Sequence, residues 1–226
     1  MEPISSHAPV TPPRGFTLVE MLVVLVIIAV VTTIALVGQG TFNRTILLTD
    51  TAYKVALSIR EMQSYGLSSR KFSSVQNPGY GAHFTASDLE SYTLFADILR
   101  TAGVPTNCPA GDPPAYDAKP GNCLYDSGDG VVQTYTFGRG YSILFFCGKL
   151  GSDEYCSNGS GGLQITDLDI AFLRSDTDTV INGKRASSGW TPLSSAEIRI
   201  GSPTEEFRSI CVSSVGQVSV MAEDCP

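Results

Sequence analysis

Residues 16–37 read FTLVEMLVVLVIIAVVTTIALV, and Glu20 is the only charged side chain among them. At a rise of 1.5 Å per residue, a helix of this length extends about 33 Å, which matches the hydrocarbon core of a bilayer. The slightly positive mean hydropathy of the whole chain therefore has a local origin. We expect a transmembrane helix over about residues 16–37.

The segment that follows, Thr41 to Ser69, keeps apolar residues at helical spacing, while polar residues fill the other faces. The apolar stripe consists of Leu48, Ala52, Val55, Ile59 and Met62. The sequence therefore predicts one long helix over residues 16–69, membrane-embedded in its first half and amphipathic in its second. Gly38 and Gly40 mark a weak point, because each glycine costs about 1 kcal/mol relative to alanine in a helix.

On the other side of the apolar run lie residues 1–15, MEPISSHAPVTPPRG, with four prolines and no apolar periodicity. A Sec-type signal peptide has its cleavage site after the apolar run. Here the candidate cleavage site, between Gly15 and Phe16, precedes the run. We expect a leader over residues 1–15, whose removal leaves the apolar helix attached as the new N-terminus.

Glu20 is unusual because a carboxylate at the centre of a lipid-embedded helix costs about 2.5–3.5 kcal/mol. Cleavage after Gly15 would create a free α-amine on Phe16, four residues before Glu20. A positive amine can pair with this carboxylate, within one subunit or across to a neighbour. We therefore interpret Glu20 as a residue that acts in assembly.

The string GFTLVEMLVVLVIIAVV, residues 15–31, resembles the N-terminal signature of type IV prepilins and type II secretion pseudopilins. The resemblance is strong from Arg14 to about Val37 and looser beyond. It implies that a membrane aspartyl prepilin peptidase cuts after Gly15 and methylates the amine of Phe16. It also implies that Glu20 pairs with the amine of a neighbouring subunit during filament assembly.

The same resemblance implies the location and the partners. The subunit waits in the bacterial cytoplasmic membrane as a single-pass protein, with its globular domain outside and lipid around its helix. An assembly ATPase and a platform protein then move it into a filament of pilin or pseudopilin subunits. A pilus fibre subunit, a minor tip or initiating pilin, and a pseudopilin of a secretion or DNA-uptake machine all fit.

Three features favour a minor pilin or pseudopilin among these. The helix lacks the central proline common in major pilins, and the leader is long with one basic residue. The segments AEIRI (196–200) and RSICV (208–212) resemble minor pseudopilins with an H-type globular domain.

Residues 70–226 alternate β-rich runs with turn residues, which predicts a globular domain built on an antiparallel sheet. The fold class is therefore α+β, with a long N-terminal helix packed on the sheet. The hairpin turn between the last two strands is expected at Ser213-Ser214-Val215-Gly216, with Gly216 where φ > 0 is needed. The expected strands lie in Tyr92–Phe95, Val131–Phe137, Tyr141–Cys147, Leu163–Leu173, Ile198–Ile200 and Ser209–Met221.

All six cysteines lie between residues 108 and 225, without a CxxC pair. The even count behind a membrane segment predicts disulfides in an oxidising compartment rather than a zinc site. Six cysteines allow fifteen pairings. The simplest pairing joins sequence neighbours: Cys108–Cys123, Cys147–Cys156 and Cys211–Cys225.

The net charge of −7 disfavours a nucleic acid partner, since broad phosphate binding needs a basic surface. We expect no cofactor and no metal. Two acidic segments, Asp126–Gly130 and Asp176–Asp178, offer oxygen ligands for calcium, but turns use the same residue types and neither segment has EF-hand spacing. His7 and His83 show no catalytic pattern, so we expect no enzyme.

One alternative belongs to another class of protein. A single-pass membrane anchor could carry an extracytoplasmic enzyme or binding domain, with FTLVE arising by chance. The two interpretations differ in the mature N-terminus: an intact Met1 in the presence of a prepilin peptidase would favour the alternative.

Overall fold

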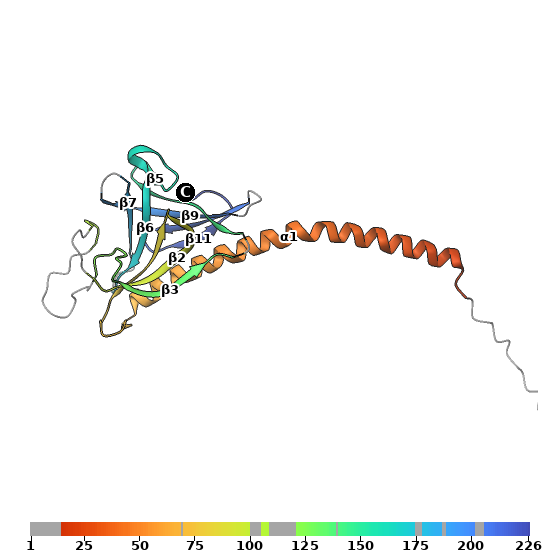
Figure 1. The fold of residues 1–226 in the computed structure, drawn as a ribbon, viewed down its shortest axis with the longest axis horizontal. Coiled ribbons are helices and arrows are strands. Elements are labelled where there is room, and N and C mark those ends of the chain that lie inside the picture. Colours follow the sequence, from red (N-terminus) through yellow and green to blue (C-terminus); the bar gives the residue numbers. More distant parts are fainter. Residues whose placement is uncertain are drawn as a thin grey trace, which may run out of the picture. The chain divides into compact units, whose positions relative to one another are not determined.

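The computed structural model describes residues 15–68, 70–99, 105–108, 121–138, 140–174, 178–186, 189–201 and 206–226. One long α-helix is followed by antiparallel strands, which confirms the α+β class (Figure 1). Backbone contacts divide the chain into two compact units, Met1–Arg44 and Thr45–Pro226. The expected leader lies outside the described residues except for Gly15.

Helix α1 runs from Leu18 to Leu67, slightly shorter at both ends than expected, and its backbone is helical through Gly38 and Gly40. The division between the two units falls inside this helix, not after it. The reason is the apolar stripe, which is almost completely buried over Leu48, Ala52, Val55, Ile59 and Met62. The second part of α1 is therefore a core element of the globular unit.

The strands form two antiparallel sheets, where the sequence analysis expected one. The six-stranded sheet has the order β3-β2-β1-β6-β7-β8, and the five-stranded sheet has the order β11-β10-β9-β4-β5. The strands of the first are β1 Gly79–Thr85, β2 Asp88–Asp97, β3 Gly130–Thr136, β6 Ile165–Phe172, β7 Thr179–Arg185 and β8 Trp190–Leu193. Those of the second are β4 Ser142–Leu150, β5 Asp153–Cys156, β9 Ser195–Gly201, β10 Phe207–Ser213 and β11 Val218–Met221.

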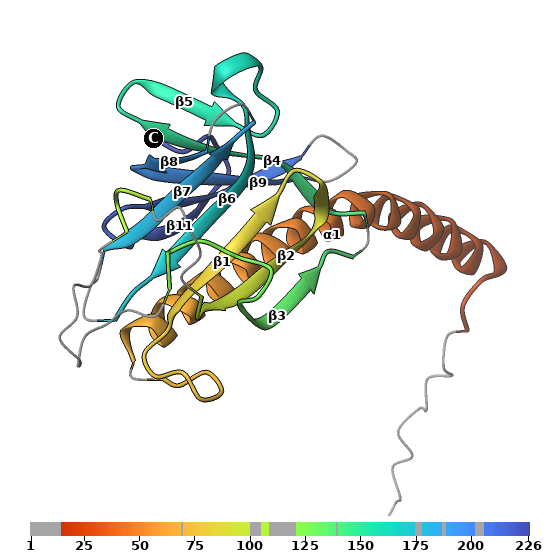
Figure 2. The same cartoon turned by 60° about the vertical axis from the view of Figure 1, so that its left-hand side comes forward.

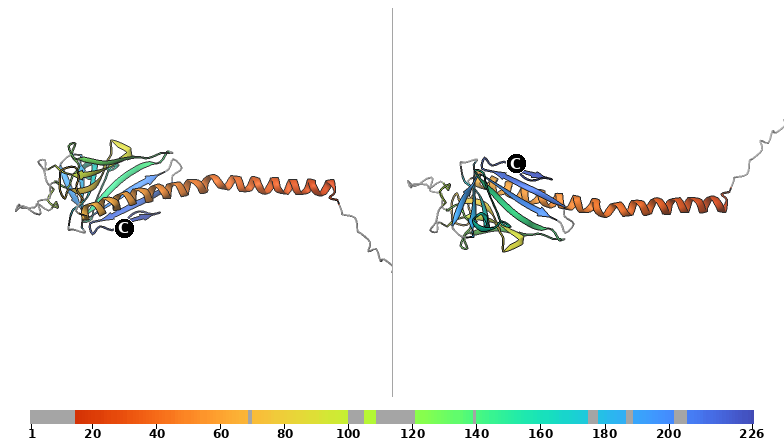
Figure 3. Two further views of the ribbon diagram at one scale, coloured as in Figure 1. Left: turned by 90° about the horizontal axis from the view of Figure 1, so that it is seen from below. Right: turned by 90° about the horizontal axis from the view of Figure 1, so that it is seen from above.

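One core joins the amphipathic part of α1 to both sheets, and the three lie against one another in Figures 2 and 3. Its largest fully buried side chains include Phe84 from β1 and Phe146 from β4. Near its end α1 approaches β6 closely, because a Cβ on Gly66 would lie 2.5 Å from the carbonyl oxygen of Phe172. A glycine is needed at this contact.

Each of the expected β segments overlaps an observed strand, and the last segment covers most of the β10–β11 hairpin. Gly216 in its turn has φ 81°, the left-handed conformation that the turn requires. Strands β1, β5, β7 and β8 were not expected. A short 3-10 helix, Gly161–Leu163, precedes β6.

Candidate functional site

The candidate cleavage bond lies just before α1 and is not covered by the described chain. Gly15 and Phe16 are both exposed, Phe16 to 73%. A Cβ built on Gly15 would meet no atom within 4 Å. Among the described residues, therefore, none covers this bond.

Thr17 caps the start of α1. Its side-chain Oγ1 accepts a hydrogen bond from the backbone N–H of Glu20 at 3.2 Å. Thr17 and Glu20 have the T-x-x-E spacing of a capping box, in which the hydroxyl satisfies a backbone donor of the first turn. Glu20 also places a negative charge at the positive end of the helix dipole. This cap was not predicted above, although the T-x-x-E spacing is present in the sequence.

The apolar span of α1 covers Leu18–Leu36, with mean hydropathy 2.8 and none of its residues buried within the chain. Its two threonines do not leave polar groups unpaired. The hydroxyl of Thr32 donates to the carbonyl of Ile28 at 2.7 Å, and that of Thr33 to the carbonyl of Ala29 at 2.8 Å. Such internal pairing is what a lipid environment demands, so the span fits a single-pass membrane anchor.

Three disulfides tie the globular unit, and they join the sequence neighbours named above. Cys108–Cys123 packs with Ala171 of β6 and Val180 of β7, two neighbouring strands of the six-stranded sheet. Cys147–Cys156 links β4 to β5. Cys211–Cys225 ties the C-terminal residues to β10.

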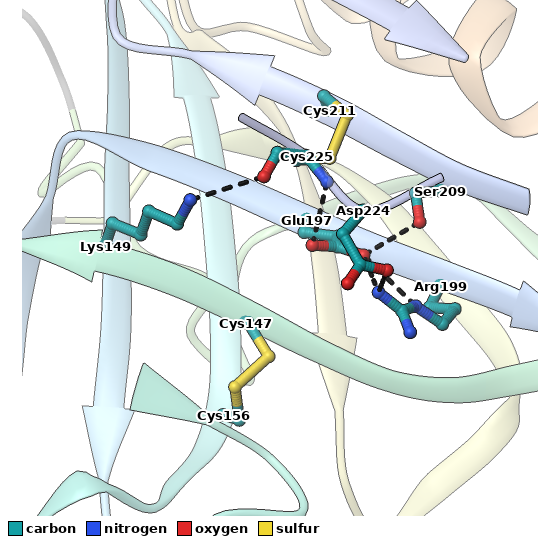
Figure 4. A network of polar contacts seen from close by, with 9 residues as sticks. All are labelled: Cys147, Lys149, Cys156, Glu197, Arg199, Ser209, Cys211, Asp224 and Cys225. Atoms are coloured by element: carbon teal, nitrogen blue, oxygen red, sulfur yellow. Dashed lines mark hydrogen bonds and ion pairs between the residues drawn. A yellow bond between two sulfur atoms is a disulfide. The ribbon is translucent and has the colours of Figure 1, made fainter. Parts of the chain in front are cut away.

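Glu197 on β9 lies between the second and third disulfides (Figure 4). Glu197 is only 7% exposed, and both oxygens of its carboxylate accept hydrogen bonds. Oε1 accepts from the guanidinium of Arg199 at 2.6 Å and from the hydroxyl of Ser209 at 2.8 Å, and Oε2 accepts from the N–H of Cys225 at 3.3 Å. Arg199 also pairs with Asp224. Glu197 and Arg199 thus hold the C-terminal residues on the sheet.

The carboxylates near the first disulfide accept hydrogen bonds from backbone N–H groups. Asp129, within the candidate calcium segment, accepts the N–H groups of Ile98 and Leu99 at 3.0 Å each and that of Asp126 at 2.8 Å. The Asp129 carboxylate thus connects the turn at Asp126 to the end of β2. In the second segment only Asp178 is described.

Asp97 is fully buried, and its carboxyl accepts the N–H groups of Asn122 at 3.1 Å and Cys123 at 2.6 Å. Burial raises the pKa of this carboxyl to about 8, an effect that nearby Asp129 increases and the hydrogen bond from Cys123 opposes. Burial also raises the pKa of Asp169, against the hydrogen bond from His83. Both groups therefore bind a proton more tightly in the folded chain than in the unfolded chain, where an Asp titrates near 3.9.

This has a consequence for stability against pH. The stability that protonated Asp97 contributes is present below about pH 4 and is lost as pH rises to about 8. We expect the melting temperature of the detergent-solubilised chain to fall by at least about 5 °C between pH 5 and pH 8.5. In an Asp97→Asn variant the slope should be much smaller, whatever its absolute stability. A melting temperature that is flat or rises over this range would contradict the assignment.

His83 on β1 pairs with a buried carboxylate, a contact that the sequence pattern did not indicate. Its Nδ1 lies 2.6 Å from the buried Asp169 carboxylate, and its ring lies 4.6 Å from that of Tyr125. The described residues contain one cluster with metal-binding atoms, Cys147, Glu154 and Cys156. Since these two sulfurs form a disulfide, they are not the thiolates that a metal needs.

Comparison with known proteins finds one match. The family model described as the prokaryotic N-terminal methylation motif matches residues 13–36, which include Gly15, Phe16 and Glu20. No curated protein and no solved structure matches the chain. The motif, together with the apolar helix, confirms the resemblance to type IV pilins and pseudopilins at the N-terminal end of the chain.

Proposed function

We propose that this chain, as a carrier of the prokaryotic N-terminal methylation motif, is a structural subunit of a type IV pilus or of a type II secretion-like pseudopilus. The observation that supports this most is the position of the motif over residues 13–36. It places the uncovered Gly15–Phe16 bond directly before a helix of membrane length. Prepilin-type processing retains such a helix, whereas a secretory signal would be removed.

In this proposal the precursor sits in the bacterial cytoplasmic membrane through Leu18–Leu36, with the globular unit outside. Three disulfides support that side, because disulfides persist in oxidising compartments. A prepilin peptidase removes the leader after Gly15 and methylates Phe16. The new amine then lies one helical turn from Glu20.

Assembly follows from the chemistry of the uncovered helix. A platform protein and an ATPase would transfer the subunit into a filament, where apolar helices of neighbouring subunits replace lipid around Leu18–Leu36. The Phe16 amine of one subunit and Glu20 of another would neutralise each other in the apolar interior, where an unpaired charge is costly. The proposal includes no catalytic step, no cofactor and no nucleic acid partner for this subunit.

The mature N-terminus tests the proposal. We expect mass spectrometry of the chain, purified from its own host, to find N-methylated Phe16 as the first residue. In a strain without prepilin peptidase the same chain should retain residues 1–15. An intact leader in the presence of the peptidase would reject the proposal and favour the membrane-anchored alternative.

A further inference from the structure

A groove of about 480 Å³ lies between the amphipathic part of α1 and strands β2 and β3, and we name it the α1–β3 groove. Both of its walls belong to the globular unit. The helix contributes Leu47, Thr51 and Val55, and the strand side contributes Tyr92, Tyr135 and Phe137.

The floor of this groove presents apolar ring surface. Tyr92 stacks on Tyr135 with ring centroids 5.3 Å apart, and its hydroxyl lies 2.9 Å from that of Ser58. The two charged residues at the groove, Asp50 and Lys54, are paired with each other at 2.7 Å. The groove therefore fits an uncharged apolar group better than an ionic ligand.

A small apolar projection lies elsewhere on the same unit. Val215, in the turn between β10 and β11, is 68% exposed, the highest value among the large hydrophobic residues described in the globular unit. Turns ordinarily carry polar residues at such positions. The hairpin is fixed to α1, since Gln63 Nε2 donates to the carbonyl of Gly216 at 3.0 Å and Arg60 Nη2 donates to that of Val218 at 2.6 Å.

The groove and the turn lie on opposite flanks of α1. At 100° per residue, Leu47, Thr51 and Lys54 point about 180° away from Arg60 and Gln63 around the helix axis. The two features are also displaced along the axis. Twelve residues separate Thr51 from Gln63, which corresponds to about 18 Å.

We propose that the Val215 turn of one copy of this chain docks in the α1–β3 groove of a second copy. Two parallel copies placed side by side bring opposite flanks together, and the axial displacement shifts each copy relative to the last. A contact between two different patches can be repeated from copy to copy. When each copy is also shifted along the axis, the assembly does not close into a ring and forms a helical array. This inference rests on the proposed filament function, in the case of a subunit that repeats along the filament, and it assigns the contact between the globular units of neighbouring copies.

Cysteine cross-linking tests this contact in assembled filaments. Gly138 lines the groove, and a Cβ there meets no atom within 4 Å, so Gly138→Cys fits without strain. No described cysteine is free to interfere. A chain with both Gly138→Cys and Val215→Cys should form a ladder of dimers, trimers and larger species in sheared filaments. Gly138→Cys combined with Leu163→Cys, a second exposed position, is the matched control and should form no ladder.

The outcomes separate this inference from the filament proposal. Filaments that contain the double variant without a ladder would overturn the docking contact and leave the proposed function intact. If Val215→Cys cross-links only to another kind of filament subunit and not to a second copy of this chain, the docking contact would also be overturned. In addition, Val215→Asp should reduce the recovery of this chain in filaments at least about tenfold with an unchanged melting temperature, because the side chain is exposed in the single copy. Unchanged recovery would count against the contact.

Discussion

Replacing Glu20 by alanine will leave leader removal intact and lower the amount of this chain in sheared filaments at least about tenfold. Removing one partner of an ion pair buried in apolar surroundings costs about 3–5 kcal/mol, and about 1.4 kcal/mol already corresponds to a factor of ten. The proposed cleavage bond lies four residues before Glu20, and no described residue covers it. Immunoblotting of membrane and filament fractions, together with the mass of the N-terminus, measures both effects.

The control variants separate charge from helix capping. Glu20→Gln keeps a side chain that can complete the capping box but has no charge, so we expect it to fail like Glu20→Ala. Thr17→Ala removes the hydroxyl that accepts the Glu20 N–H and should cost only about 1 kcal/mol of helix stability. Normal incorporation of Glu20→Gln would show that Glu20 acts through its cap and not through its charge.

Ile59→Ala will destabilise the globular unit strongly. Ile59 lies on α1 and is fully buried in the core formed with both sheets. Loss of a buried isoleucine to alanine costs about 2–5 kcal/mol, and each kcal/mol lowers the melting temperature by about 2–4 °C in a domain of this size. We therefore expect the melting temperature of the detergent-solubilised chain to decrease by about 4–20 °C.

Leu57→Ala is the matched control on the same helix. Leu57 is 58% exposed, and substitution at such a site usually changes stability by less than about 0.5 kcal/mol. A small effect of both variants would show that the second part of α1 is only a connector, and that the compact unit begins after the helix.

The helix and the processing motif could be predicted from sequence because their signals are local. Residues 16–37 carry a membrane-length apolar run, and the stripe from Leu48 to Met62 repeats at the helical period. The same stripe does not reveal where the globular unit begins along α1. An amphipathic helix indicates that its apolar face packs against a partner, but its periodicity does not show at which residue the compact unit starts.

The missed strands contain residues that ordinarily interrupt a sheet. In β1, Gly81 is required because a Cβ would lie 2.5 Å from the carbonyl of Ile170. In β7, Asn182-Gly183 has the composition of a hairpin turn, yet Gly183 makes room for Leu193 of β8. Pro192 is tolerated because β8 is at the edge of its sheet. These strands depend on contacts between distant segments, which local propensity does not report.

The site was predictable to a similar degree. Gly15, Phe16 and Glu20 were predicted from their spacing, and the Thr17 cap could have been predicted in the same way. Glu197 could not, because its partners come from β10 and from the C-terminal residues. Its neighbours across the sheet are Cys147 on β4 and Cys211 on β10, and only the strand register brings them together.

The division of the chain within α1 determines how a soluble form can be produced. A shortened chain that begins after Leu67, where α1 ends, would lack the apolar stripe that fills the core. A truncation that starts at Thr45 removes the whole lipid-seeking span and retains both Leu48 and the hydrogen bond from Thr45 Oγ1 to Glu206 at 2.8 Å. This shortened chain would have to be exported to an oxidising compartment, because the three disulfides do not form in the reducing cytosol.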